Sequence, residues 1–321
     1  MKIKNLIVTA AFVLIISTST SISLCDLNSY QLTKIIIDEN EKNIKPSIPI
    51  IAHRGFSSLE IENTTKAVDL GFESNCTTAV EIDIQLTKDN EIVLFHDSKI
   101  NDKKISEYTL EELKQIPITE NTFDNFNDYL ETLFDCKSGN ITRERMNNLK
   151  TKQGNIATLD EILELHDYYP DKELIIELKT NEDNKDILID KLYKKLENHS
   201  NTNIIIQSSN YEALLNMKNK YPNLKYHLII NQSNYKHLNK LEFDGYGIKK
   251  NLINYDDIKN LLDNNKKVSI WTINSYSEYE NILSQLGDLK EKVSYITNYP
   301  DALRTWHNII TKNNNKYKIK K

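Results

Sequence analysis

Short apolar runs alternate with amphipathic stretches of helix length from Ile48 to the end of the chain. This alternation predicts βα units and a parallel sheet, because successive parallel strands need a long crossover that a helix usually supplies. We expect strands near residues 49–53, 79–85, 92–96, 173–178, 203–207, 225–230, 245–249, 267–273 and 294–297. We expect helices near residues 64–74, 109–116, 158–168, 184–198, 211–220, 234–240, 255–264, 276–285 and 300–312.

One pair of strands breaks this pattern. Only the short turn Lys88-Asp89-Asn90 separates 79–85 from 92–96, so these two are predicted to pair as a hairpin or an adjacent ladder. Eight parallel strands then remain, which favours a closed α/β (βα)8 barrel of the TIM type over residues 48–312. An open doubly wound sheet would need a glycine-rich nucleotide loop after the first strand, and residues 53–58 do not supply one.

The segment 118–155 is long and polar, without the periodicity of a strand. In a barrel it is expected to be a βα-loop insertion, either over the active face, where such loops shape substrate choice, or as a disordered surface loop.

Polar side chains stand where several of the apolar runs end. In a barrel these ends meet on the functional face. Glu81 and Asp83 are two residues apart and therefore share one face of their strand, and Glu177 ends another strand. Buried carboxylates are costly unless they are paired or bound to metal, so the three predict a divalent cation. Oxygen ligands favour Mg²⁺ or Ca²⁺ over zinc.

The same region resembles the glycerophosphodiester phosphodiesterase family. Its pattern appears in order as His53-Arg54-Gly55, Glu62-Asn63-Thr64, Glu81-Ile82-Asp83, Leu86-Thr87-Lys88-Asp89-Asn90 and His96-Asp97. Two positions depart from this pattern: Asn90 stands where the family usually has Gly, and Ile61 stands where it usually has Pro. Further matching pieces are Glu177-Leu178-Lys179, Gln207-Ser208, Trp271-Thr272-Ile273-Asn274 and Thr297-Asn298-Tyr299-Pro300-Asp301. The resemblance covers roughly residues 48–305 and implies the same barrel.

The residue types in these motifs suggest separate catalytic and binding roles. His53 and His96 are the expected acid and base, in an order that the sequence leaves open, because imidazole titrates near neutral pH. Arg54 and Lys179 are expected to bind phosphate oxygens. Glu62 is expected to orient Arg54, the metal shell or the glycerol hydroxyls. The resemblance also implies Glu81, Asp83 and Glu177 as metal ligands, and Trp271 near the glycerol moiety.

These expectations describe a metal-dependent enzyme that cleaves small-molecule glycerophosphodiesters into glycerol 3-phosphate and an alcohol. One alternative is a lysophospholipid- or phosphoinositide-directed phosphodiesterase on the same barrel. Another is a non-catalytic surface protein that binds glycerophospho-compounds. Nucleic acid is not an expected partner, because the chain has 41 Lys and Arg against 46 Asp and Glu and contains no long basic cluster.

Residues 1–25 have the pattern of a targeting signal, with Lys2 and Lys4 before an apolar run. The signal predicts a secreted or extracytoplasmic protein. Cys25 adds the alternative of a lipoprotein tethered to the membrane. Residues 26–47 are expected to be a spacer. Cys76 and Cys136 either pair or stay as two thiols, since sequence does not give their separation.

Overall fold

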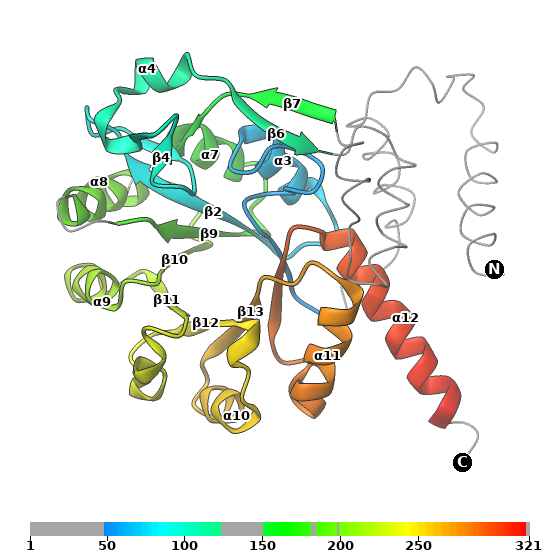
Figure 1. The fold of residues 1–321 in the computed structure, drawn as a ribbon. Helices are drawn as coiled ribbons and strands as arrows, with labels where there is room; N and C mark the ends of the chain where they lie inside the picture. The colour runs from blue at the N-terminus through cyan, green and yellow to red at the C-terminus, as the bar shows by residue number, and fades with distance from the viewer. Residues whose placement is uncertain (1–47, 123–149, 181–183, 198, 319–321) are drawn as a thin grey trace, which may run out of the picture.

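The computed structural model describes residues 48–122, 150–180, 184–197 and 199–318. Eight parallel strands form a closed barrel, because β1 (Ile50–Ala52) pairs with both β2 (Ala79–Leu86) and β14 (Ser294–Thr297). The strands between them are β9 (Glu173–Leu178), β10 (Ile204–Ser208), β11 (Lys225–Ile230), β12 (Gly245–Lys249) and β13 (Lys267–Trp271). The predicted (βα)8 barrel is therefore confirmed (Figure 1).

Helices lie around the outside of these strands (Figure 1). Several begin at a Ser, Thr or Asn whose side-chain oxygen accepts a bond from a backbone N–H of the first turn, as Asn210 does from Ala213. The α-helices are α3 (Thr65–Glu73), α4 (Leu110–Lys114), α7 (Leu159–His166), α8 (Lys185–Glu197), α9 (Tyr211–Lys220), α10 (Tyr255–Asp263), α11 (Tyr276–Leu286) and α12 (Pro300–Lys318). The 3-10 helices are η2 (Ile105–Glu107), η4 (Tyr235–Lys240), η5 (Lys250–Leu252) and η6 (Gly287–Leu289).

The inside of the barrel changes from apolar to polar along the strands. One layer is apolar and consists of Ile51, Ala79, Ile175, Ile205 and Ile296. Two residues further along each strand the side chains point to the same face, and there they are mostly polar. This polar layer contains His53, Glu81, Glu177, Gln207 and Asn298. The apolar layer thus forms the floor beneath a polar mouth.

Strand β2 continues beyond the barrel. Its far end, Ile84–Leu86, pairs antiparallel with β3 (Ile92–Leu94), which confirms the predicted hairpin. Glu81 and Asp83 consequently lie within β2, so the prediction that they stand at its end was wrong. Because β3 runs back toward the barrel, the residues after it return to the level of Asp83, where the Phe95 N–H donates to the Asp83 carbonyl at 3.1 Å.

The expectation that the segment 118–155 lacks strands was also wrong at both of its ends. Strand β6 (Ile118–Thr122) pairs antiparallel with β7 (Lys150–Gly154), and the residues between them lie outside the described part of the chain. Lys152 Nζ of β7 donates to the Leu59 carbonyl at 2.6 Å, so the ribbon contacts the loop that follows β1. The remaining short strands are β4 (Lys99–Ile100), β5 (Lys103–Lys104) and β8 (Ala157–Thr158).

Some predictions fall outside the described residues: the signal over 1–25, the spacer over 26–47, and Cys136. They stay predictions. Cys76 is buried, and Arg304 Nη1 lies 3.5 Å from its sulfur. Within the described residues, none of the helices has the length and apolar character needed to cross a bilayer.

Candidate active site

The turn after β1 is fixed to β2 by backbone geometry. Arg54 and Gly55 have φ angles of 57° and 82°, and a Cβ on Gly55 would lie 2.4 Å from the carbonyl carbon of Ala67. Only glycine fits this position. The Arg54 N–H donates to Glu81 Oε2 at 3.0 Å and the Gly55 N–H to the Glu81 carbonyl at 3.1 Å. His53 and Glu81 are thereby held at the same mouth of the barrel.

Three carboxylates meet there, as the sequence predicts. Glu81, Asp83 and Glu177 each offer an oxygen, and these atoms all lie within 4.8 Å of one another. Burial, with Asp83 and Glu177 as charged neighbours, raises the pKa of Glu81 well above its usual value. Burial likewise raises the pKa of Glu177 to about 7. Burial opposes ionisation of Asp83 too, but Lys179, Arg54 and the Asn63 amide outweigh it and lower that pKa.

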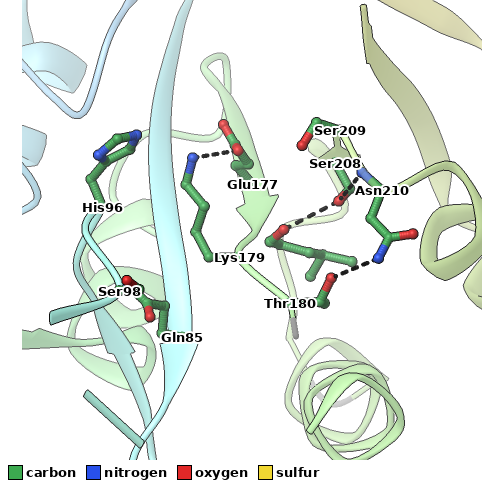
Figure 2. Close-up of a pocket in the computed structure, with 10 residues that line it drawn as sticks. Gln85, His96, Ser98, Glu177, Lys179, Thr180, Ser208, Ser209 and Asn210 are labelled. Carbon is green, nitrogen blue, oxygen red and sulfur yellow. Dashed lines mark hydrogen bonds and ion pairs between the residues drawn. The ribbon is translucent and has the colours of Figure 1, made fainter. Parts of the chain in front are cut away.

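Two cations stand beside the carboxylates. Lys179 Nζ lies 3.1 Å from Asp83 Oδ1. It also donates to Glu177 Oε1, as Figure 2 shows. Arg54 Nε lies 3.2 Å from Asp83 Oδ2, and its Nη1 donates to Glu62 Oε1 at 2.6 Å. Of the three partners expected for Glu62, the structure therefore shows Arg54. Both cations are partly exposed, with 16% of the Arg54 side chain and 23% of the Lys179 side chain accessible.

The two histidines have different partners. His53 Nδ1 lies 2.7 Å from Asn298 Oδ1, and an amide oxygen can only accept, so Nδ1 carries the hydrogen and Nε2 is the basic nitrogen. Burial, reinforced by the Arg54 charge, lowers the pKa of His53 to about 4. His96 Nδ1 lies 2.8 Å from Oδ1 of Asp97, an exposed carboxylate.

The carboxylate cluster fits a hard divalent cation. All three donors are oxygens, they come from the two neighbouring strands β2 and β9, and Asp83 lies directly opposite Glu177 in the register. Burial and neighbouring carboxylates disfavour the ionised forms of Glu81 and Glu177, and a bound cation would offset both effects. The set contains neither His nor Cys, which zinc prefers.

Three side chains of the site belong to the matching sequence pieces but were given no role by the sequence analysis. Asn63 Nδ2 donates to Asp83 Oδ2 at 2.9 Å, and its Oδ1 accepts from the Asp83 N–H at 3.0 Å. Gln207 Nε2 lies 3.5 Å from Glu81 Oε1. Asn298 holds His53. Gln207 and Asn298 are polar residues at strand ends, so the rule that found the carboxylates would have included them.

Trp271 ends β13 and borders a cavity of about 200 Å³ at the barrel mouth. His53, Arg54, Glu81, His96 and Glu177 line the same cavity. The Trp271 indole Nε1 donates to the Gly247 carbonyl at 2.9 Å. This hydrogen bond fixes the orientation of the ring and does not involve the face of the ring. The structure thus brings together the predicted catalytic histidines, carboxylates and cations, with Trp271 beside them.

A comparison with protein families matches residues 53–301 to the glycerophosphoryl diester phosphodiesterase family. A glycerophosphodiester phosphodiesterase from Bacillus altitudinis is 39% identical over 71 residues, which are 21% of this chain and 29% of that protein. One from Caldanaerobacter subterraneus is 26% identical over 187 residues, 56% of this chain and 65% of that protein. The chain thus spans less than two thirds of the length of these curated relatives.

Solved structures share the fold. A phosphodiesterase from Oleispira antarctica, in complex with the product sn-glycerol-3-phosphate, has a TM-score of 0.61 at 22% identity and covers 81% of this chain and 96% of its own. A glycerophosphodiester phosphodiesterase from Parabacteroides distasonis has a TM-score of 0.61 at 20% identity, with 83% and 100% covered. Since the family match extends over most of the chain, the protein belongs to the glycerophosphoryl diester phosphodiesterase family.

Proposed function

We propose that the protein hydrolyses glycerophosphodiesters to glycerol 3-phosphate and an alcohol. The observation that carries this proposal is that two histidines with unlike partners, the carboxylates Glu81 and Glu177 and two cations line one cavity, with Asp83 next to both carboxylates. Membership of the family supports the same reaction, and so does the sn-glycerol-3-phosphate product bound to the Oleispira antarctica phosphodiesterase.

A divalent cation, Ca²⁺ or Mg²⁺, would be held by Glu81, Asp83 and Glu177. When bound, it would supply positive charge that stabilises the charge developing on phosphate oxygens. Arg54 and Lys179 would bind the remaining phosphate oxygens. Glu62 and Asp83 hold the guanidinium in place, so it is preorganised for a phosphate in the cavity.

The hydrogen bonds of the histidines support different roles for the two rings. His53, neutral with Nε2 basic, takes the proton of the nucleophile, which is water or the glycerol hydroxyl of the substrate. His96, whose ring contacts the Asp97 carboxylate through Nδ1, gives a proton to the oxygen of the leaving alcohol. One P–O bond forms to the nucleophile and the P–O bond to the alcohol breaks. If the glycerol hydroxyl attacks, water then opens the cyclic phosphate.

The test is release of glycerol 3-phosphate by the full chain from glycerophosphoglycerol and glycerophosphocholine, with Ca²⁺, with Mg²⁺ and with a chelator. We expect cation-dependent release that Glu81→Ala and His53→Ala abolish. Glu164→Gln, an exposed position on α7, is the control and should behave as the wild type. Full turnover by His53→Ala would overturn the mechanism, and unchanged activity after exhaustive chelation would overturn the cation assignment.

A further inference from the structure

We propose that a second cavity, beside the carboxylate cluster, receives the leaving alcohol and selects uncharged alcohols that carry several hydroxyl groups, such as glycerol or a cyclitol. This inference rests on the proposed hydrolysis and names the alcohol that it releases. The cavity has a volume of about 270 Å³, enough for a group of this size.

The position of the cavity identifies the alcohol side. Four residues line both cavities: His96, Glu177, Lys179 and Ser209. His53 and Arg54 line only the first. In an in-line displacement the attacking and leaving oxygens lie on opposite sides of phosphorus. An alcohol that takes its proton from His96 therefore leaves on the side away from His53, and the second cavity opens there.

The lining of the second cavity consists mainly of hydroxyl and amide groups. Figure 2 shows them around the ion pair of Glu177 and Lys179. They are Gln85, Ser98, Thr180, Ser208, Ser209 and Asn210. A hydroxyl group both donates and accepts hydrogen bonds, and so does each hydroxyl of a polyol. The lining thus matches a ligand that presents several hydroxyls close together.

Part of this lining is held in place before a ligand arrives. Ser208 Oγ donates to the Leu178 carbonyl at 3.2 Å and accepts from the Asn210 N–H at 3.1 Å. Asn210 Nδ2 donates to Thr180 Oγ1 at 3.4 Å, while its own Oδ1 caps helix α9. Since Thr180 Oγ1 acts as acceptor in this contact, its O–H can donate to a ligand. A prearranged donor loses little freedom on binding.

The same lining disfavours other alcohols. A quaternary ammonium such as choline is recognised by aromatic faces, and none of the described residues that line this cavity is aromatic apart from the His96 imidazole. The only carboxylate of the described lining, Glu177, is paired with Lys179, whose charge also repels a cationic group. Leu178 is the only apolar residue of the described lining, which offers little surface for an acyl chain.

The experiment compares kcat/KM of the full chain for four esters: glycerophosphoglycerol, glycerophosphoinositol, glycerophosphocholine and glycerophosphoethanolamine. We expect the two polyol esters to exceed the two amino-alcohol esters by about tenfold or more, as two or more hydrogen bonds would give. Thr180→Val keeps the shape and removes the hydroxyl, so it should lower the ratio of polyol to choline kcat/KM about threefold to tenfold. Ser98 is exposed, and Ser98→Ala should also lower the ratio of polyol to choline kcat/KM.

Thr305→Val on the exposed face of α12 is the matched control, and its ratio should equal that of the wild type. A wild-type ratio at or below one, or an unchanged ratio in both Thr180→Val and Ser98→Ala, would overturn the inference while the hydrolysis stands. Absence of turnover with all four esters would instead overturn the proposed hydrolysis, and the inference with it. The two failures are therefore distinguishable in one set of assays.

Discussion

The Asn298 side-chain oxygen lies 2.7 Å from Nδ1 of His53, although the two residues are 245 positions apart in the chain. Asn298 follows the last strand of the barrel and His53 follows the first, and these strands are neighbours. An amide at this position presents an acceptor without adding a charge. The contact therefore selects the tautomer of His53 in which Nε2 carries the lone pair.

Replacing Asn298 tests this arrangement. Asn298→Leu removes the acceptor, so we expect kcat to fall about tenfold to a hundredfold with little change in KM, because the imidazole loses its orientation. Asn298→Asp keeps the acceptor and adds a negative charge, which raises the pKa of His53 above its value of about 4. The acid limb of the pH profile of kcat/KM should then move to higher pH. An acid limb unchanged in Asn298→Asp would show that His53 is not the base.

The assignment of His96 as the acid predicts a dependence on the leaving group. His96→Ala should lower kcat/KM for an alkyl ester such as glycerophosphocholine about 10²-fold to 10⁴-fold. The p-nitrophenyl ester of glycerol 3-phosphate should lose less than about tenfold, because p-nitrophenolate leaves without a proton. Asp97→Asn should show the same selectivity, more weakly. Equal losses on both esters would contradict the assignment, and His53→Ala, which impairs the base, should give such equal losses.

The carboxylate cluster predicts an effect of pH and cation on stability. The pKa of Glu81 is raised in the fold, so the folded state binds this proton more tightly than the unfolded chain does. In the absence of a cation, the contribution of Glu81 to stability is therefore present below about pH 4.5 and is lost as the pH rises through the raised pKa. At pH 8 with chelator, Glu81→Gln should therefore raise Tm, by about 2–4 °C for each kcal/mol of repulsion removed.

Added Ca²⁺ or Mg²⁺ should raise the Tm of the wild type and have little effect on Glu81→Gln, since only the folded site binds the ion. Glu164→Gln again serves as the control. Equal cation-induced shifts in Tm for the wild type and Glu81→Gln would place the cation elsewhere.

His227 predicts a loss of stability in acid. Its side chain is buried, its Nε2 has no hydrogen-bond partner among the described residues, and burial lowers its pKa to about 3. In the unfolded chain His227 is protonated as the pH falls through about 6.5, whereas in the folded state it stays neutral. Its contribution to stability is therefore fully present above pH 6.5 and is lost as the pH falls toward 3. Lowering the pH from 7.5 to 5.5 should reduce the free energy of unfolding by about 1.4 kcal/mol through His227.

Urea denaturation of the wild type and of His227→Phe at these two pH values measures this contribution. His53, His166 and His307 also have lowered pKa values and are common to both proteins, so the difference isolates His227. A variant that loses as much stability as the wild type would contradict the prediction.

The alternation of apolar runs was sufficient to predict the barrel, because buried parallel strands and their helices leave a periodic signal. The carboxylate cluster followed from the same signal, since Glu81, Asp83 and Glu177 are charged residues within apolar runs of strand length. The pairing of His53 with Asn298 could not be predicted, because it depends on how the first and last strands meet. The β6–β7 ribbon was missed because polar residues dominate both strands, which are joined by backbone hydrogen bonds.

Because β1 pairs with β14, the site can form only after both of these strands have been synthesised. His53 emerges from the ribosome well before its partner Asn298, which follows 245 positions later. Contacts of such large sequence separation are costly to form and come late in folding. A nascent or prematurely terminated chain would therefore carry the carboxylates and both histidines without an oriented base, so hydrolysis would report that the whole barrel has been made and closed.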